Sequence, residues 1–85
     1  MLEAGKVYIQ TQGSGYRVTH TDSILLVISK NPYGRGLVWV KVIRSRCDWC
    51  IGEHYEINAQ GLVEYGVNEL TRVEQNRIMK WELER

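Results

Sequence analysis

The sequence predicts a small domain that is mainly β, with a helix confined to its C-terminal end. Its 85 residues include nine valines, seven isoleucines and five tyrosines against two alanines, and β-branched and aromatic side chains favour strands over helices. Glycine-containing turns separate short apolar segments along most of the chain, as in strands joined by tight turns. Residues 68–85 contain neither glycine nor proline and are rich in glutamate and arginine, which favours a helix there.

Residues 37–44 form the clearest expected strand. Small apolar residues alternate there with larger ones, as Val38, Val40 and Val42 against Trp39, Lys41 and Ile43. Since alternate residues of a strand point to opposite faces, we expect the valines on one face and the larger residues on the other. Residues 24–30 are apolar on both faces, which indicates a strand that is covered twice or that curls as in a small barrel. Residues 31–36 hold a proline and two glycines, so these two strands are expected to form an antiparallel hairpin.

Three further short strands are expected at residues 6–11, 16–21 and 53–58, each next to a glycine-containing turn. Residues 62–65 follow the last of these turns. We therefore expect them to form a hairpin with the strand at 53–58.

Two interpretations fit the C-terminal segment. In the first, Thr71 and Glu74 have the spacing of a capping box, and the helix that follows lies against the sheet through an apolar stripe. The stripe consists of Ile78 with Trp81 and of Met79 with Leu83. In the second, a single tight turn at 67–70 precedes a final strand at 71–74, and a short helix follows from Gln75. We favour the second because of a resemblance to a known fold.

Residues 61–74 read Gly-Leu-Val-Glu-Tyr-Gly-Val-Asn-Glu-Leu-Thr-Arg-Val-Glu, and this ending resembles that of small SH3-like barrels, in which a one-turn 3₁₀ helix precedes the final strand. The earlier segment 51–57, Ile-Gly-x-x-Tyr-x-Ile, is similar to a strand opening of small phage-encoded or bacterial barrel proteins. The resemblance implies a single domain, with an antiparallel SH3-like barrel at residues 1–74 and a helical tail at 75–85. The chain lacks the acidic loop and aromatic groove of signalling SH3 domains, which argues against recognition of polyproline peptides.

Two cysteines are the residues most suggestive of a metal. Cys47 and Cys50 have the Cys-x-x-Cys spacing that can present two thiolates to zinc, with His54 nearby and His20 elsewhere in the chain. A closed structural site usually shows a second such pair, which this sequence lacks. We therefore expect two thiols in a turn, without metal or other cofactor, and keep a zinc-stabilised interaction domain as an alternative.

Catalytic motifs are absent from the sequence. It contains no phosphate-binding glycine loop, no nucleophile elbow and no zinc-protease helix, and its carboxylates are scattered singly. We expect a protein that is not an enzyme.

The apolar runs fall far short of the roughly 20 residues of a membrane span, and the N-terminus does not resemble a signal peptide. We expect a cytoplasmic protein without membrane contact.

The charges divide the chain into a basic half and an acidic half. Residues 1–46 carry seven Lys or Arg against two acids, and residues 47–85 carry four against eight acids. We expect a partner-binding surface on the hairpin, formed by Tyr33, Arg35, Trp39, Lys41, Arg44 and Arg46. The alternative is that the C-terminal segment, with Trp81, covers Trp39, and that the basic residues pair with the acidic half.

These observations predict a non-catalytic binding module of the phage-type accessory or inhibitory kind, with a protein partner. The alternative is a nucleic-acid-binding barrel that uses the basic hairpin at 30–46 on phosphates and the aromatic residues as stacking platforms. The chain is expected to be a monomer or a homodimer, because a domain of this size buries a modest share of its surface.

Overall fold

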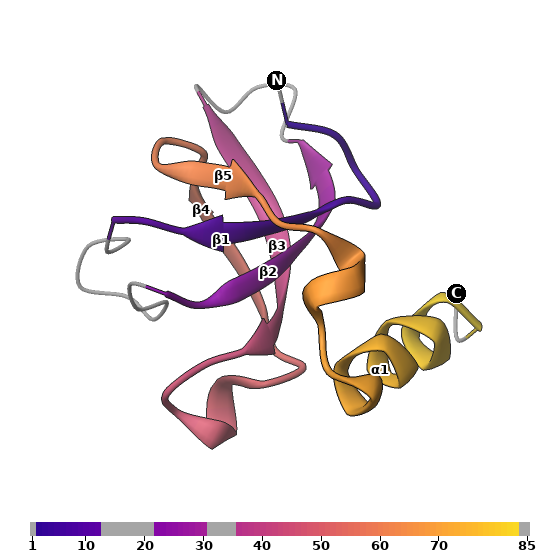
Figure 1. Ribbon diagram of the computed structural model, residues 1–85. Coiled ribbons are helices and arrows are strands. Elements are labelled where there is room, and N and C mark those ends of the chain that lie inside the picture. The colour runs from indigo at the N-terminus through magenta and orange to yellow at the C-terminus, as the bar shows by residue number, and fades with distance from the viewer. Residues whose placement is uncertain (1, 13–21, 31–35, 84–85) are drawn as a thin grey trace.

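The computed structural model describes residues 2–12, 22–30 and 36–83, which form one antiparallel sheet and one helix (Figure 1). The mainly β fold and the C-terminal helix are therefore confirmed. The elements in chain order are β1 (Val7–Gln10), β2 (Ile24–Lys30), β3 (Leu37–Arg44), the 3₁₀ turn η1 (Asp48–Cys50), β4 (His54–Asn58), β5 (Leu62–Glu64), the 3₁₀ turn η2 (Val67–Glu69) and α1 (Arg72–Leu83).

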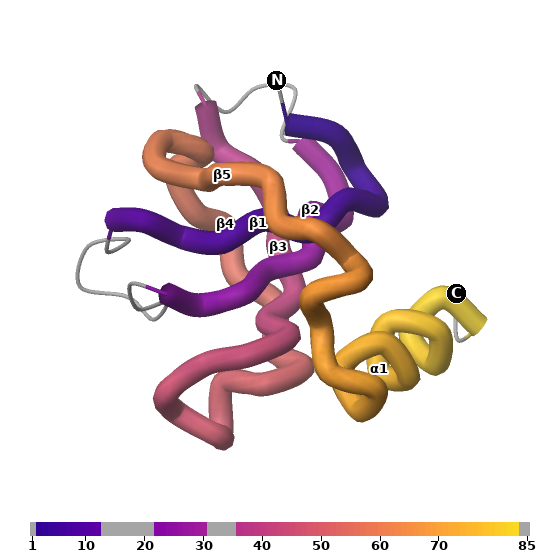
Figure 2. Tube along the Cα trace, viewed as in Figure 1, coloured from indigo at the N-terminus to yellow at the C-terminus, as the bar shows by residue number. Residues whose placement is uncertain are grey.

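The strands follow one another in the order β4-β3-β2-β1-β5. Within the described ranges the sheet is not closed, so the structure does not confirm a barrel. The expected hairpin between β4 and β5 is wrong, because β5 crosses to the opposite edge and pairs with β1 (Figure 2). Backbone hydrogen bonds fix this pairing. The Thr11 N–H donates to the Gly61 carbonyl oxygen and the Tyr65 N–H donates to the Val7 carbonyl oxygen, each at a distance of 2.9 Å.

The two central strands have the predicted bounds and pair antiparallel, with Lys30 opposite Val38. The turn between them lies outside the described residues except for Gly36, whose φ of +73° favours glycine. The strand expected at 16–21 also lies outside the described residues. The strand expected at 53–58 begins one residue later than predicted.

The inner face of the sheet forms the larger apolar core. The predicted valines are buried there: Val38 is 3% exposed, and Val40 and Val42 are fully buried. The residues they pack with include Tyr8, Leu25, Val27, Cys50 and Ile57. The period of two along β3 thus correctly assigns the core face.

A second apolar cluster covers part of the outer face. Its buried members are Val7, Ile24, Leu26, Ile43 and Leu70, and Ile9, Tyr65, Ile78 and Trp81 pack against them. Because Leu70 follows η2 and the last two residues belong to α1, the C-terminal segment covers the outer face over one end of β3. This explains why β2 is apolar on both faces.

The start of α1 corrects the preferred interpretation of residues 71–74. They do not form a strand, and the helix begins at Arg72 rather than at Gln75. The capping box operates in both directions: Glu74 N–H donates to Thr71 Oγ1 over 3.2 Å, and Thr71 N–H donates to Glu74 Oε1 over 2.9 Å. These bonds satisfy amide groups that a helix start leaves unpaired. The one-turn 3₁₀ helix expected just before this segment is present as η2.

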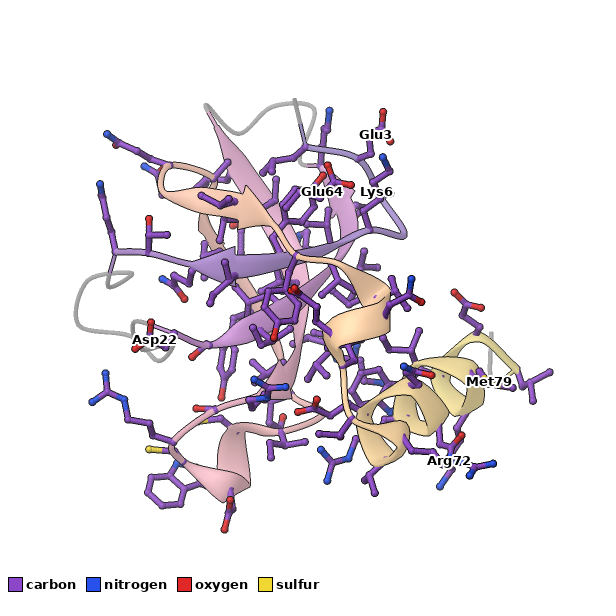
Figure 3. All side chains as sticks on the ribbon, viewed as in Figure 1. Glu3, Lys6, Asp22, Glu64, Arg72 and Met79 are labelled. Carbon is purple, nitrogen blue, oxygen red and sulfur yellow. The ribbon has the colours of Figure 1, made fainter. Side chains whose placement is uncertain are left out.

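Half of the expected apolar stripe of α1 is confirmed. Ile78 and Trp81 pack on the outer face, whereas Met79 and Leu83 are exposed (Met79 is labelled in Figure 3). At 100° per residue, Met79 points away from the Ile78 and Trp81 side of the helix. In residues 2–12, 22–30 and 36–83, no helix is long and apolar enough to cross a membrane.

Candidate functional site

The outer face of β3 changes from exposed to buried along the strand. Trp39 exposes 42% of its surface, Lys41 is half-buried and Ile43 is fully buried. These three residues share one face, so the change reflects how far α1 reaches across the sheet. We call the uncovered part around Trp39, Lys41 and His54 the open half of the outer face.

Side chains on neighbouring strands form rows across the open half. Leu26, Lys41 and His54 lie opposite one another on β2, β3 and β4. In the next row, Trp39 lies between Ser29 and Glu56. Directly opposite residues in antiparallel strands have adjacent side chains, so the indole of Trp39 has a carboxylate as its neighbour.

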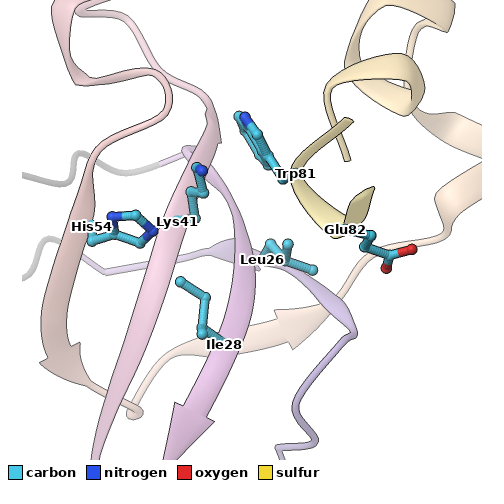
Figure 4. A pocket seen from close by; sticks show the side chains of 6 residues that line it. All are labelled: Leu26, Ile28, Lys41, His54, Trp81 and Glu82. Carbon is cyan, nitrogen blue, oxygen red and sulfur yellow. The ribbon is translucent and has the colours of Figure 1, made fainter. Parts of the chain in front are cut away.

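A groove separates the open half from the end of α1 (Figure 4). Its volume is about 170 Å³, and it is lined by Leu26, Ile28, Lys41, His54, Trp81 and Glu82. The isoleucine and leucine provide an apolar floor, while the remaining residues add an indole, two bases and one acid. A cavity of about 150 Å³ can hold a benzene-sized group, so this groove can accept one large apolar side chain.

Lys41 connects the open half with the helix. Its ammonium nitrogen lies 4.3 Å from the ring centroid of Trp81, which is a cation–π distance. The predicted binding residue Lys41 therefore forms one wall of the groove and also holds α1 on the sheet.

Arg44 forms an ion pair with the helix, although 41% of its side-chain surface is exposed. Its Nε and Nη2 donate to the two carboxylate oxygens of Glu74 over 2.6 and 2.7 Å, a bidentate pair. The hydrogen bond from Arg44 lowers the pKa of Glu74 from 4.5 to about 2, and the same bond raises the pKa of Arg44. This pair fixes the first turn of α1 to the end of β3.

The other predicted binding residues are placed as follows. Arg46 is exposed in the loop after β3, beyond the helix-covered end of the strand. Tyr33 and Arg35 lie outside the described residues. The structure thus places Trp39 and Lys41 together on the open half and separates them from Arg44 and Arg46.

Contacts between the basic and acidic halves of the chain are present, as the alternative interpretation of the charges expects. Besides the Arg44 pair, Lys6 lies 3.5 Å from Glu64 of the acidic half, and it also lies 3.1 Å from Glu3 within its own half (Figure 3). The hydrogen bond with Glu3 and the charges of the two carboxylates raise the pKa of Lys6. These side chains are exposed, so they contribute little to stability.

The two cysteines lie at either end of a tight turn. Cys47 is half-buried and Cys50 is buried, and no disulfide joins them. Cys50 packs in the inner core, and burial together with a hydrogen bond to Cys50 raises the pKa of Tyr55. His54 instead faces the groove, and His20 lies outside the described residues. Within the residues that the structure describes, no three His, Cys, Asp or Glu side chains gather at a distance suited to a metal.

Trp49 is a candidate that the sequence analysis does not single out. It lies in η1 at the tip of the loop between β3 and β4 and is 77% exposed. The signal for it was a large aromatic residue within a short polar segment, Cys-Asp-Trp-Cys. The spacing of its two cysteines is typical of a metal site and gives no reason to select the tryptophan.

No family model, curated protein or solved structure matches the chain. The assignment of a function therefore depends on the geometry of the open half and on the charges around it.

Proposed function

We propose that the protein is a non-catalytic binding module and that the open half of the outer face binds a protein partner. One observation carries the proposal: Trp39 is 42% exposed on a face that α1 covers at its other end. Tryptophan is enriched among the residues that dominate binding energy at protein interfaces. The adjacent groove can receive a side chain of the partner beside it.

The charges around Trp39 favour a protein over a nucleic acid. Glu56 lies directly opposite Trp39, and Glu82 lines the groove. Carboxylates repel phosphate groups, whereas protein interfaces tolerate both signs of charge at their rims. Arg44, which would otherwise add a cation to the basic hairpin, is held by Glu74.

The SH3-like relationship and the role as a phage-type accessory or inhibitory protein belong to the same proposal. The 3₁₀ turn at Val67–Glu69 and the five antiparallel strands support the relationship. The open sheet and the helix that directly follows the turn differ from the expected pattern.

A comparison of two tryptophan variants tests the proposal. Proteins retained from an extract of the source organism are identified, and their dissociation constants are measured with the purified wild type, Trp39→Ala and Trp49→Ala. We expect Trp39→Ala to weaken binding about 30-fold, the equivalent of a 2 kcal/mol interface anchor, and Trp49→Ala to change it less than about threefold.

Equal affinities of Trp39→Ala and the wild type would refute the proposed surface. A salt titration with mixed oligonucleotides covers the other class of partner. Binding that falls steeply with salt concentration would indicate phosphate contacts and would favour the nucleic-acid alternative.

A further inference from the structure

Among the residues that the structure describes, β4 forms one edge of the sheet and no other strand pairs with its outer side. β4 contains five residues, His-Tyr-Glu-Ile-Asn, with neither lysine nor proline, whereas the opposite edge strand β5 contains three. Natural proteins block exposed edges with such residues, with bulges or with very short strands. An edge of this length without them favours the addition of another strand.

The hydrogen bonds of β3 show which backbone groups of β4 point outward. The Val42 N–H donates to the Glu53 backbone carbonyl oxygen at 3.1 Å, and the Ala59 N–H donates to the Gly36 carbonyl oxygen at 2.7 Å. In an antiparallel pair every second residue bonds to its neighbour, so Tyr55 and Ile57 use their N–H and C=O groups toward β3. The backbone groups of the residues between them point to the open edge. These residues are His54, Glu56 and Asn58, and all three are exposed.

The side chains of β4 are complementary to those of a second β4. If two copies pair antiparallel around Tyr55, each His54 lies directly opposite the second copy's Glu56. The imidazole N–H of His54 can donate a hydrogen bond to the carboxylate of Glu56 in such a pair. A carboxylate can accept several hydrogen bonds, so this pairing is compatible with other contacts of Glu56.

We propose that two copies of the chain associate through their β4 edges into one continuous ten-stranded sheet. A register centred on Glu56 would instead place two carboxylates opposite each other, which destabilises a strand pair. The match of the His54 imidazole with the Glu56 carboxylate, together with the repulsion between two facing carboxylates, selects both the second copy as the occupant and Tyr55 as the centre.

The dimer has a consequence for the outer face. A twofold axis perpendicular to the sheet keeps equivalent faces on the same side, so both open halves face one direction. Three inter-strand spacings of about 4.8 Å separate the two β3 strands, or about 14 Å across the sheet. A partner with two equivalent segments could bind both Trp39 surfaces at once, with a corresponding gain in avidity.

The test uses a proline on each edge strand. Glu56→Pro removes an outward N–H that β3 does not use, and edge strands accept proline at such positions. Glu64→Pro makes the same change on β5: the bonds of Thr11 to Gly61 and of Tyr65 to Val7 show that the Glu64 N–H also points outward. The mass of each protein is measured by sedimentation equilibrium over a concentration series, with circular dichroism and urea unfolding as folding controls.

We expect the wild type and Glu64→Pro to reach twice the 9.9 kDa chain mass, and folded Glu56→Pro to remain monomeric at the same concentrations. Hydrogen exchange of the wild type gives a readout without any variant. The amides of His54 and Glu56 should become protected as the concentration rises through the dimer range. Because partner binding by Trp39 is measured separately, failure of the dimer leaves the proposed function open to its own test.

Several results would overturn the dimer. The wild type would stay monomeric at millimolar concentration, or Glu56→Pro would still dimerise. Alternatively, Glu64→Pro would lose dimerisation to the same extent as Glu56→Pro. The register has its own check in Glu56→Gln, which should weaken dimerisation roughly threefold by reducing two cross-strand pairs. A tighter dimer in that variant would contradict the register centred on Tyr55.

Discussion

Ile43 and Trp39 lie on the same face of the same strand, yet Ile43 is fully buried and Trp39 exposes 42% of its surface. The difference arises from α1, which the Arg44–Glu74 pair and the contacts of Ile78 and Trp81 hold over one end of β3. The covered end contributes to folding, whereas the open half presents an aromatic residue to solvent. We infer from this comparison that stability and recognition are separated along one strand.

The largest expected effect is at the covered end. Ile43→Ala removes a fully buried side chain from the outer cluster, and such truncations cost about 2 to 5 kcal/mol. Urea unfolding should show a loss of about 3 kcal/mol. A loss below about 1 kcal/mol would mean that α1 does not pack on this end as described.

The second largest effect concerns the ion pair that fixes α1. Glu74→Gln keeps the size of a buried side chain but loses the charge that binds Arg44 over 2.6 and 2.7 Å. We expect about 2 kcal/mol of destabilisation in urea unfolding. Gln75→Ala is a suitable comparison, since it removes only the partly exposed amide contacts with Val67 and Leu70.

The same pair predicts a pH dependence. The pKa of Glu74 is lowered in the folded chain from 4.5 to about 2, so its stabilising contribution is present above about pH 4.5 and is lost as the pH falls toward 2. The difference in unfolding free energy between the wild type and Glu74→Gln should be constant from pH 7 to pH 5 and shrink below that range. A constant difference down to pH 2.5 would rule out this linkage.

The sequence predicts the central strands well because their periodicity is local. The alternation from Val38 to Ile43 assigns both faces of β3, and the turn residues at 31–36 indicate its pairing with β2. The partner of β5 could not be derived in this way, since pairing with β1 joins residues about fifty positions apart and leaves no local pattern. The hairpin with β4 was expected only because the two segments are adjacent in the chain.

The C-terminal segment shows how a resemblance can outweigh a physical signal. Thr71 and Glu74 carry the spacing of a capping box, and the structure uses it. The strand preferred at 71–74 followed from the SH3-like ending instead. The sequence also identifies Trp39 and Lys41 as neighbours on one face, but it could not show that Arg44 is bound by Glu74 across 30 positions or that Trp81 reaches Lys41.

The smallest expected effect is at the loop tip. Trp49 is 77% exposed in η1, so Trp49→Ala removes few packing contacts. We expect the free energy of unfolding to change by less than about 0.5 kcal/mol. A larger loss would show that the loop between β3 and β4 packs more closely than its exposure indicates.

Trp39→Ala tests the separation of stability and recognition most directly, if its unfolding free energy and its affinity for the identified partner are both measured. We expect a loss of less than about 1.5 kcal/mol in stability, because the side chain is partly exposed, together with about 30-fold weaker binding. A loss of about 3 kcal/mol or more in stability with unchanged affinity would place Trp39 in the core and contradict the account.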